Sequence, residues 1–311
     1  MVIANPIYDV VFKRMMENEK VAKFFIGTLL EQTIETVVVK PQEFTYTDRL
    51  AGLSVFRLDF IATIKTESGE LKKVLIEIQK AKNQIDLMRF RNYLGEQYKK
   101  EDSHNDEKII LPITTIYILG FKIAEIETPC LKVERNYKDL VNKTNLKTKS
   151  DFVEKLTHDS FIVQVDRITD RFQTRLDKLL SVFEQTNFVE NTKIIKEYMH
   201  ETDVEEVKII TDILHHSGTN PKERKQIEDE QEAWRSVNAM FEDKEKELLK
   251  TLKETEKALN EKESEINEKD KALNEKVSEI NAKDKALNEK DKALEEMAKQ
   301  IEEMKRKLGE N

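Results

Sequence analysis

The sequence contains very little cysteine, proline and glycine, and it has no long apolar run. Its 311 residues include one cysteine, five prolines and seven glycines. The single cysteine, Cys130, excludes an internal disulfide, and no cysteine or histidine spacing matches a zinc site. No stretch approaches the roughly 18 consecutive apolar residues that a membrane-spanning helix needs. We therefore expect a protein without a disulfide, a zinc site or a membrane segment.

The sequence also lacks a basic excess, and we expect no secretory signal in it. Asp9, Lys13 and Arg14 lie where a signal peptide would be apolar, so we expect a cytoplasmic protein. The formal net charge is -8 with a pI of about 5.5, which argues against a protein that merely coats DNA. This charge does not exclude a nuclease, because catalytic carboxylates are acidic and a local basic helix can still contact phosphates.

Charge is distributed unevenly along the chain. Charged residues make up 37% of it and hydrophobic residues 38%, so part of the chain must be solvated. Residues 218–221 read Gly-Thr-Asn-Pro, and after them proline is absent and the aromatics are confined to Trp234 and Phe241. We predict a globular domain at residues 1–218 and a charged helical tail at residues 219–311.

The tail has an apolar residue at every seventh position. These residues are Leu252, Leu259, Ile266, Leu273, Ile280, Leu287, Leu294, Ile301 and Leu308. A strong coiled coil needs a second apolar position in each heptad, but acidic residues occupy most of those positions here. They are Glu256, Glu263, Asp270, Asp284 and Asp291. Two interpretations fit, a weak homodimer seam along the tail or a single solvated helix supported by Glu and Lys three and four residues apart.

Apolar periodicity in the first domain changes between helical and strand patterns. Residues 7–32 fit one helix, or two short helices separated at Asn18 and Glu19. Strands are predicted at residues 34–48, 53–65, 72–81 and 109–121, with a helix at 85–100. The second and third strands form a hairpin, and the fourth is a buried central strand. A further strand at 161–166 and helices at 171–186 and 204–216 complete a mixed α/β sheet flanked by helices.

Acidic and amide side chains interrupt two of the predicted strands. Asp59 lies in an otherwise apolar strand, and Glu77 and Gln79 lie two residues apart on the next. Because side chains alternate along a strand, Glu77 and Gln79 project from one face, and pairing of the strands would place Asp59 beside them. Two carboxylates suit Mg²⁺ or another divalent cation, and the backbone carbonyl of Ile78 would supply a further ligand. The metal would activate a water and neutralise charge as a phosphodiester breaks. The alternative from spacing alone is a solvated acidic face.

Several short motifs resemble those of one nuclease family. They are D-x-x-F-K at Asp9–Lys13, R-L-D-F at Arg57–Phe60, I-E-I-Q at Ile76–Gln79 and R-x-R-x-Y at Arg89–Tyr93. The run L-T-H-D-S at Leu156–Ser160, followed by FIVQV, looks like a later segment of that family. Over about residues 5–215 the chain thus resembles the Rpn-like PD-(D/E)XK nucleases, often described as transposases.

The resemblance implies a restriction-endonuclease-like fold and Mg²⁺-dependent hydrolysis of DNA, in DNA rearrangement or in defence against foreign DNA. Asp59 and Glu77 match the motif carboxylates that bind the metal. Gln79 stands where the wider superfamily commonly has lysine, although the Rpn-like group also has glutamine there. A neutral amide can orient water only through hydrogen bonds. Lys80 faces the opposite side of the strand and is a poor substitute.

Two predicted helices contain further candidate residues. In the resembling family the first helix abuts the active site, so Asp9 is a candidate catalytic residue and Lys13 a candidate DNA contact. The alternative is a surface ion pair one helical turn apart. Arg89, Arg91 and Tyr93 follow the catalytic strand and would contact DNA phosphates and stack on bases. The alternative is that Tyr93 faces the core and the cations are solvated.

The sequence therefore predicts a metal-dependent DNA endonuclease whose cofactor is Mg²⁺ and whose partner is DNA. A homodimer through the tail would bring two active sites to a duplex, as a double-strand cut requires. The competing hypothesis is a catalytically weak, nuclease-like adaptor that binds DNA or a protein and uses the tail to oligomerise.

Overall fold

The computed structural model describes residues 1–48, 53–80, 84–104, 107–189, 192–307 and 309. Within its helices and strands, residues 41–48, 53–59, 84–86, 89, 104, 237–238, 240–242 and 244–245 are described by their backbone alone. Asp59 and Arg89 belong to this second group, so their side chains lie outside the described residues.

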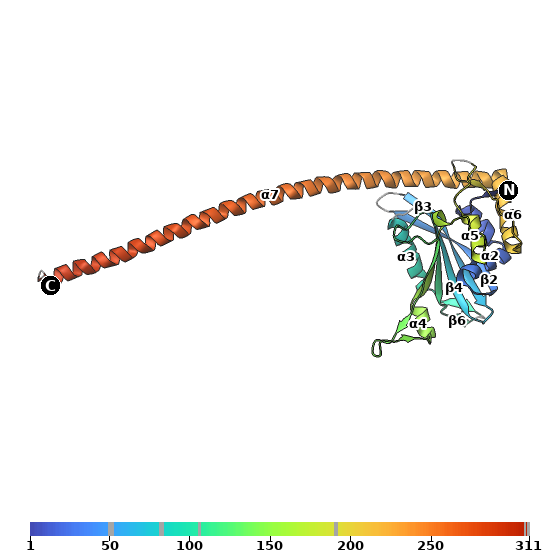
Figure 1. Ribbon diagram of the computed structural model, residues 1–311, viewed down its shortest axis with the longest axis horizontal. Helices are drawn as coiled ribbons and strands as arrows, with labels where there is room; N and C mark the ends of the chain where they lie inside the picture. Colours follow the sequence, from blue (N-terminus) through green and yellow to red (C-terminus); the bar gives the residue numbers. More distant parts are fainter. Residues whose placement is uncertain (49–52, 81–83, 105–106, 190–191, 308, 310–311) are drawn as a thin grey trace. The chain divides into compact units, whose positions relative to one another are not determined.

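Helices and strands are interspersed through the first two thirds of the chain (Figure 1). The α-helices are α1 (Asp9–Met16), α2 (Glu19–Leu30), α3 (Gln84–Lys99), α4 (Asp151–Leu156), α5 (Arg175–Leu180), α6 (Glu205–Thr219) and α7 (Pro221–Lys307), with 3-10 turns η1 (Val165–Arg167) and η2 (Ser181–Phe183). The main sheet consists of β2 (Ile34–Asp48), β3 (Leu53–Thr66), β4 (Leu71–Gln79), β7 (Ile113–Leu119), β8 (Cys130–Val133) and β11 (His158–Gln164). Short strands pair outside it, β1 (Val2–Ala4) with β12 (Ile195–Glu197), β5 (Asp102–His104) with β6 (Glu107–Ile109), and β9 (Tyr137–Lys138) with β10 (Asn145–Leu146).

The main sheet mixes parallel and antiparallel pairs, which confirms the predicted α/β class. Its order is β2-β3-β4-β7-β11-β8. β2, β3 and β4 are antiparallel, β7 runs parallel to both β4 and β11, and β8 is antiparallel to β11. The predicted hairpin is the β3–β4 pair, whose turn contains Gly69 at φ 85°. Pro41 lies within β2, and the edge position of this strand tolerates a residue without an N–H group.

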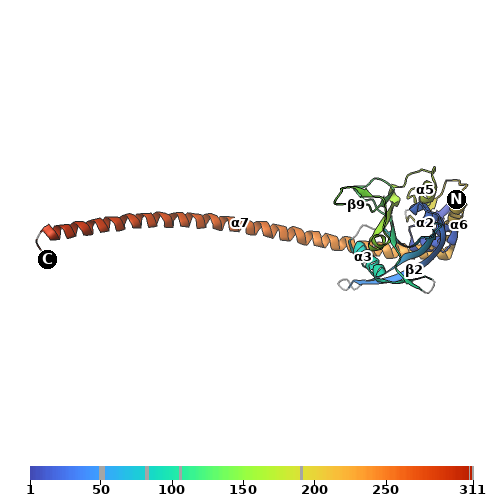
Figure 2. The same ribbon diagram turned by 90° about the horizontal axis from the view of Figure 1, so that it is seen from below.

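Helices cover both faces of the sheet (Figure 2). On one face, α1, α2, α5 and α6 form the larger core with sheet residues that include Phe60 and Ile76. Phe12 of α1 meets Phe60 edge to face, with ring centroids 5.1 Å apart. On the other face, α3 packs through Phe90 on Leu75. The two faces of β4 are therefore both buried, as its apolar composition predicts.

Local capping determines where two of the helices begin. Asn18 accepts a hydrogen bond from the Val21 N–H at 3.2 Å, so the N-terminal segment forms two short helices, one of the two predicted forms. The helix predicted at residues 171–186 is shorter than expected. Thr174 and Asp177 form a capping box that starts α5 at Arg175, and the chain then continues as the η2 turn.

The predicted tail helix is α7, which extends over 87 residues. The chain divides into two compact units, Met1–Asn238 and Ala239–Asn311, so the first turns of α7 belong to the globular unit although the composition changes near Pro221. The reason is packing, because Ile227 is fully buried in the larger core. Among the described residues, none of the helices combines the length and apolar character that a membrane crossing needs.

Candidate active site

Glu77 and Gln79 project from the face of β4 that α3 covers. They alternate along the strand with Ile76 and Ile78, whose side chains belong to the core beneath α1 and α2. Glu77 is 1% exposed and Gln79 is 9% exposed. The strand thus holds both polar side chains on one face, and it buries both of them.

Asp59 and Glu77 lie just beyond the last pair of the β3–β4 ladder. Phe60 of β3 pairs with Ile76 of β4 in an antiparallel ladder. Asp59 and Glu77 are the next positions along the two strands beyond this pair. Asp59 pairs on its other side with Gln42 of β2. Because the Asp59 side chain lies outside the described residues, its contact with Glu77 remains a prediction.

Tyr117 is a neighbour of Glu77 that the sequence analysis did not identify. It lies on the parallel strand β7 at the register position of Glu77. Burial raises the pKa of the Tyr117 phenol, and the negative charge of Glu77 raises it further, against a hydrogen bond with Thr115 that lowers it. The phenol therefore remains protonated and adds no negative charge beside the carboxylate.

The side-chain oxygens of Glu77 and Gln79 are donors of the kind that a hard divalent cation prefers. The Glu77 carboxylate and the Gln79 amide both present oxygen, the donor that Mg²⁺ prefers. The hydrocarbon side chain of Ile78 packs in the larger core and has no donor atom, so only its backbone carbonyl can contribute. Among residues whose side chains are described, no three His, Cys, Asp or Glu lie together as a metal site requires. That set does not include Asp59, the second carboxylate of the predicted cluster, because its side chain lies outside the described residues.

Lys80 points away from Gln79 and forms an ion pair with Glu230 of α7. Its Nζ also lies 4.7 Å from the ring centroid of Tyr8 and 5.2 Å from that of Trp234. Burial, followed by the charge of Glu230, raises the pKa of Tyr8 to about 12, so its ring stays neutral beside Lys80. In this arrangement Lys80 is engaged on the opposite side of β4, as expected, and does not replace a lysine at position 79.

Asp9 begins α1, and its surroundings differ from those of Glu77. The Asp9 and Val10 N–H groups donate to the two Glu230 carboxylate oxygens at 2.9 and 3.2 Å. This geometry is typical of a carboxylate at a helix N-terminus. α1 packs in the core on one face of the sheet, whereas Glu77 projects from the other face. Glu230 also pairs with Lys80, so the start of α1 lies near the end of β4. A catalytic role for Asp9 remains a prediction.

The candidate DNA contacts on α3 have different environments. Arg91 is exposed, whereas the Arg89 side chain lies outside the described residues. Tyr93 is 3% exposed and packs in the second core with Phe90 and Leu75. Tyr93 thus faces the core, as the alternative interpretation expects, because it lies three positions after Phe90 on the same face of the helix. Its ring is not placed to stack on a base.

Lys13 is half-buried and lines a pocket of about 500 Å³ between α1 and the start of α7. Arg14 and Lys222 line the same pocket. Glu223 also lies there, 3.1 Å from the Arg14 guanidinium and 2.6 Å from the Ser217 hydroxyl. The cations of this surface are thus partly neutralised, which limits the strength of a phosphate contact at Lys13.

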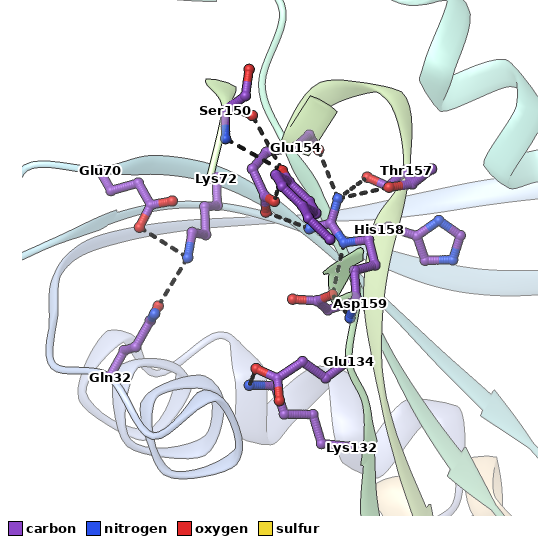
Figure 3. A network of polar contacts seen from close by, with 12 residues as sticks. Gln32, Glu70, Lys72, Lys132, Glu134, Ser150, Glu154, Thr157, His158 and Asp159 are labelled. Atoms are coloured by element: carbon purple, nitrogen blue, oxygen red, sulfur yellow. Dashed lines mark hydrogen bonds and ion pairs between the residues drawn. The ribbon is translucent and has the colours of Figure 1, made fainter. Parts of the chain in front are cut away.

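A second polar network stabilises the opposite end of the sheet (Figure 3). Arg135 donates from Nε to Asp159 at 2.8 Å and from Nη2 to Glu154 at 2.6 Å. Its Nη1 donates to the Thr157 carbonyl at 2.9 Å, and the Tyr137 hydroxyl donates to Glu154 at 2.6 Å. These bonds join β9, α4 and β11, and all three guanidinium nitrogens of Arg135 donate in them. The network is therefore structural.

The chain was compared with known proteins in three ways. No protein-family model matches it, no curated protein matches it, and no solved structure matches it.

Proposed function

We propose that the chain is a Mg²⁺-dependent DNA endonuclease with a restriction-endonuclease-like fold, and that Asp59, Glu77 and Gln79 form its catalytic cluster. The observation that supports this most is the antiparallel pairing of β3 and β4 up to Phe60 and Ile76, because Asp59 and Glu77 are the residues that follow this pair on the two strands. The motifs that resemble the Rpn-like nucleases fall on these same two strands. The mixed sheet with helices on both faces is compatible with that fold. Transposition, recombination and defence against foreign DNA are the settings that such an activity would serve.

Each residue of the cluster has a separate role in this proposal. Asp59 and Glu77 hold the metal ion through their carboxylates, and Ile78 adds its backbone carbonyl. When bound, Mg²⁺ supplies positive charge that acidifies a water ligand and neutralises the phosphodiester. Gln79, on the same face as Glu77, orients the attacking water through its amide. Gln79 cannot supply the positive charge of a lysine, so we expect a slower enzyme than one with lysine at this position.

The proposal assigns DNA contacts to cationic side chains on α3 and α1. Arg91 on α3 is exposed and free to meet a phosphate, and Arg89 precedes it by two residues. Lys13 is a secondary contact because Glu223 lies in its pocket. Two chains joined through the tail would supply the two active sites that a double-strand cut requires.

The alternative is a catalytically weak, nuclease-like adaptor that binds DNA or a protein. Two observations favour it, the 1% exposure of Glu77 and the neutral side chain at Gln79. A carboxylate this buried can reach a phosphodiester-bound metal only if the substrate enters the face that α3 covers. The adaptor needs no such access.

Nicking of supercoiled plasmid in the presence of Mg²⁺ separates the two functions. The proteins to compare are wild type, Asp59→Asn, Glu77→Gln and a matched control, Glu70→Gln. The Glu70 carboxylate is 49% exposed just before β4, so its loss should not affect the cluster. The endonuclease proposal expects nicking by wild type and the control alone. If all four proteins nick at one rate, or none does, the adaptor is favoured, and anisotropy with labelled duplex then reports whether it binds DNA.

A further inference from the structure

The helix of the second unit exposes a continuous apolar ridge, which we call the leucine ridge. Its members repeat at every seventh position, and each is between 54% and 66% exposed. They are Leu252, Leu259, Ile266, Leu273, Ile280, Leu287, Leu294 and Ile301. A strict seven-residue repeat keeps an apolar line on one side of a helix that supercoils with another helix. The repeat therefore indicates a helical partner.

Two columns of opposite charge flank the leucine ridge. The lysine column lies three residues after ridge positions and consists of Lys262, Lys269, Lys276, Lys283 and Lys290. The acidic column lies four residues after ridge positions and consists of Glu256, Glu263, Asp270, Asp284 and Asp291. All of these side chains are exposed. Because each residue turns the helix by about 100°, positions three and four residues later fall on opposite sides of the ridge.

We infer that the leucine ridge binds a second copy of this chain in parallel orientation and in register. In such a pair the twofold axis runs along the helices, so each lysine column faces the acidic column of the other copy. Lys269 then lies level with Asp270 of the second copy, and Lys283 lies level with Asp284 of the second copy. Opposite charges meet along both sides of the ridge, which favours this pairing.

An antiparallel pair has the opposite consequence. Its twofold axis runs across the helices, so lysine column meets lysine column and acidic column meets acidic column. Like charges in direct contact destabilise a helix pair and disfavour that arrangement. The leucine ridge alone would fit either orientation, and the flanking columns select the parallel one.

The C-terminal end of α7 supplies the apolar burial that the charged middle lacks. There Met297 and Met304 replace lysine three residues after Leu294 and Ile301. All four side chains are more than half exposed in the single chain. They form the two apolar positions per heptad that a two-stranded coiled coil packs together. The apolar C-terminal end thus favours association of two helices, and the charged columns favour their parallel orientation.

Disulfide formation tests the orientation on the full-length chain. Cys130, the only cysteine, is replaced by serine, and Ile266→Cys and Leu294→Cys are made separately in that background. Every ridge residue faces its own counterpart in a parallel, in-register pair, so both variants should form covalent dimers on mild oxidation. In an antiparallel pair only a residue at the midpoint faces itself, so two positions four heptads apart cannot both cross-link. Lys271→Cys, on the side away from the ridge, is the control that should stay monomeric.

Charge exchange tests the columns without relying on a cross-link. Lys269→Glu with Lys283→Glu should weaken dimerisation at least about tenfold, because like charges then face each other. Adding Asp270→Lys and Asp284→Lys restores opposite charges and should return the dissociation constant to within about threefold of wild type. Sedimentation equilibrium measures both values. The inference is overturned if the exchanged protein stays weak, if one or neither cysteine variant cross-links, or if the wild-type chain is monomeric.

Discussion

Lys80 directly follows Gln79, yet its ammonium group pairs with Glu230, a residue 150 positions further along the chain. Glu230 also accepts hydrogen bonds from the first two N–H groups of α1. One carboxylate at the base of α7 thus joins the end of β4 to the start of α1. Together with the buried Ile227, this carboxylate ties the start of α7 to the globular unit, which extends to Asn238.

Removing the Glu230 carboxylate should destabilise the globular unit. The Lys80 and Glu230 side chains are only 12% and 17% exposed. We expect Glu230→Ala to lower the free energy of unfolding by about 2 kcal/mol, since Lys80 and a helix N-terminus both lose their partner. Trp234, the only tryptophan, lies beside Lys80 and reports urea unfolding by fluorescence. Glu228 on the same helix is only partly buried and pairs with Arg224, with 42% of its side chain exposed. Glu228→Gln should change stability by less than about 0.5 kcal/mol. An equal loss in both variants would contradict the account.

Truncation should locate the true end of the globular unit. A chain that ends at Asn238 keeps Ile227 and Glu230, so its melting temperature should match that of the full-length protein. A chain that ends at Gly218 loses the fully buried Ile227 and the Glu230 contacts. We expect it to be less stable by about 4 kcal/mol or more. Equal stability of the two truncated proteins, measured by thermal denaturation, would show that the start of α7 is not part of the fold.

Tyr93 and Arg91 should have separable effects on α3. Tyr93→Phe keeps the buried ring and should leave DNA affinity within about twofold of wild type, because the ring faces Leu75 and Phe90. Arg91→Ala should weaken binding and reduce the slope of log affinity against log salt by about 1. Fluorescence anisotropy with a labelled duplex measures both. If Tyr93→Phe lowers DNA affinity as much as Arg91→Ala does, the Tyr93 hydroxyl takes part in DNA binding.

The sequence predicted features that depend on strict periodicity, and it missed those that depend on packing. Alternation along β4 put Glu77 and Gln79 on one face because a strand has a fixed period of two. Tyr117 was missed because a strand buried on both faces, such as β7, shows no polar alternation to mark its neighbours. Ile227 and Glu230 lie in a highly charged segment, so composition could not show that they belong to the globular unit. The sequence alone does not show which of the two tyrosines of α3 is buried. In the structure Tyr93 is 3% exposed and Tyr98 is 37% exposed, because only Tyr93 lies on the side of α3 that packs on the sheet.

His158 should make stability depend on pH in the range just below neutrality. Its Nδ1 lies 2.8 Å from the Tyr98 hydroxyl. Burial, followed by the positive charge of Arg135, lowers the pKa of His158, against Asp159, which raises it. The unfolded chain therefore takes up a proton near pH 6.5 more readily than the folded chain, and the free energy of unfolding falls as pH drops below 6.5. His158→Gln should flatten this dependence between pH 7 and pH 5 in urea denaturation. If the free energy of unfolding changes with pH in the same way in wild type and His158→Gln, then His158 is not the source of the dependence.

The ratio of Mg²⁺-dependent plasmid nicking rates for wild type and Glu77→Gln tests the central claim most directly. The substitution removes the charge but keeps the size of a side chain that is 1% exposed, so the fold should remain. Far-ultraviolet circular dichroism and the melting temperature check that it does. The account predicts a rate at least about 100-fold lower for Glu77→Gln, since the metal loses a carboxylate ligand. Equal rates for the two folded proteins would contradict a catalytic site at Glu77.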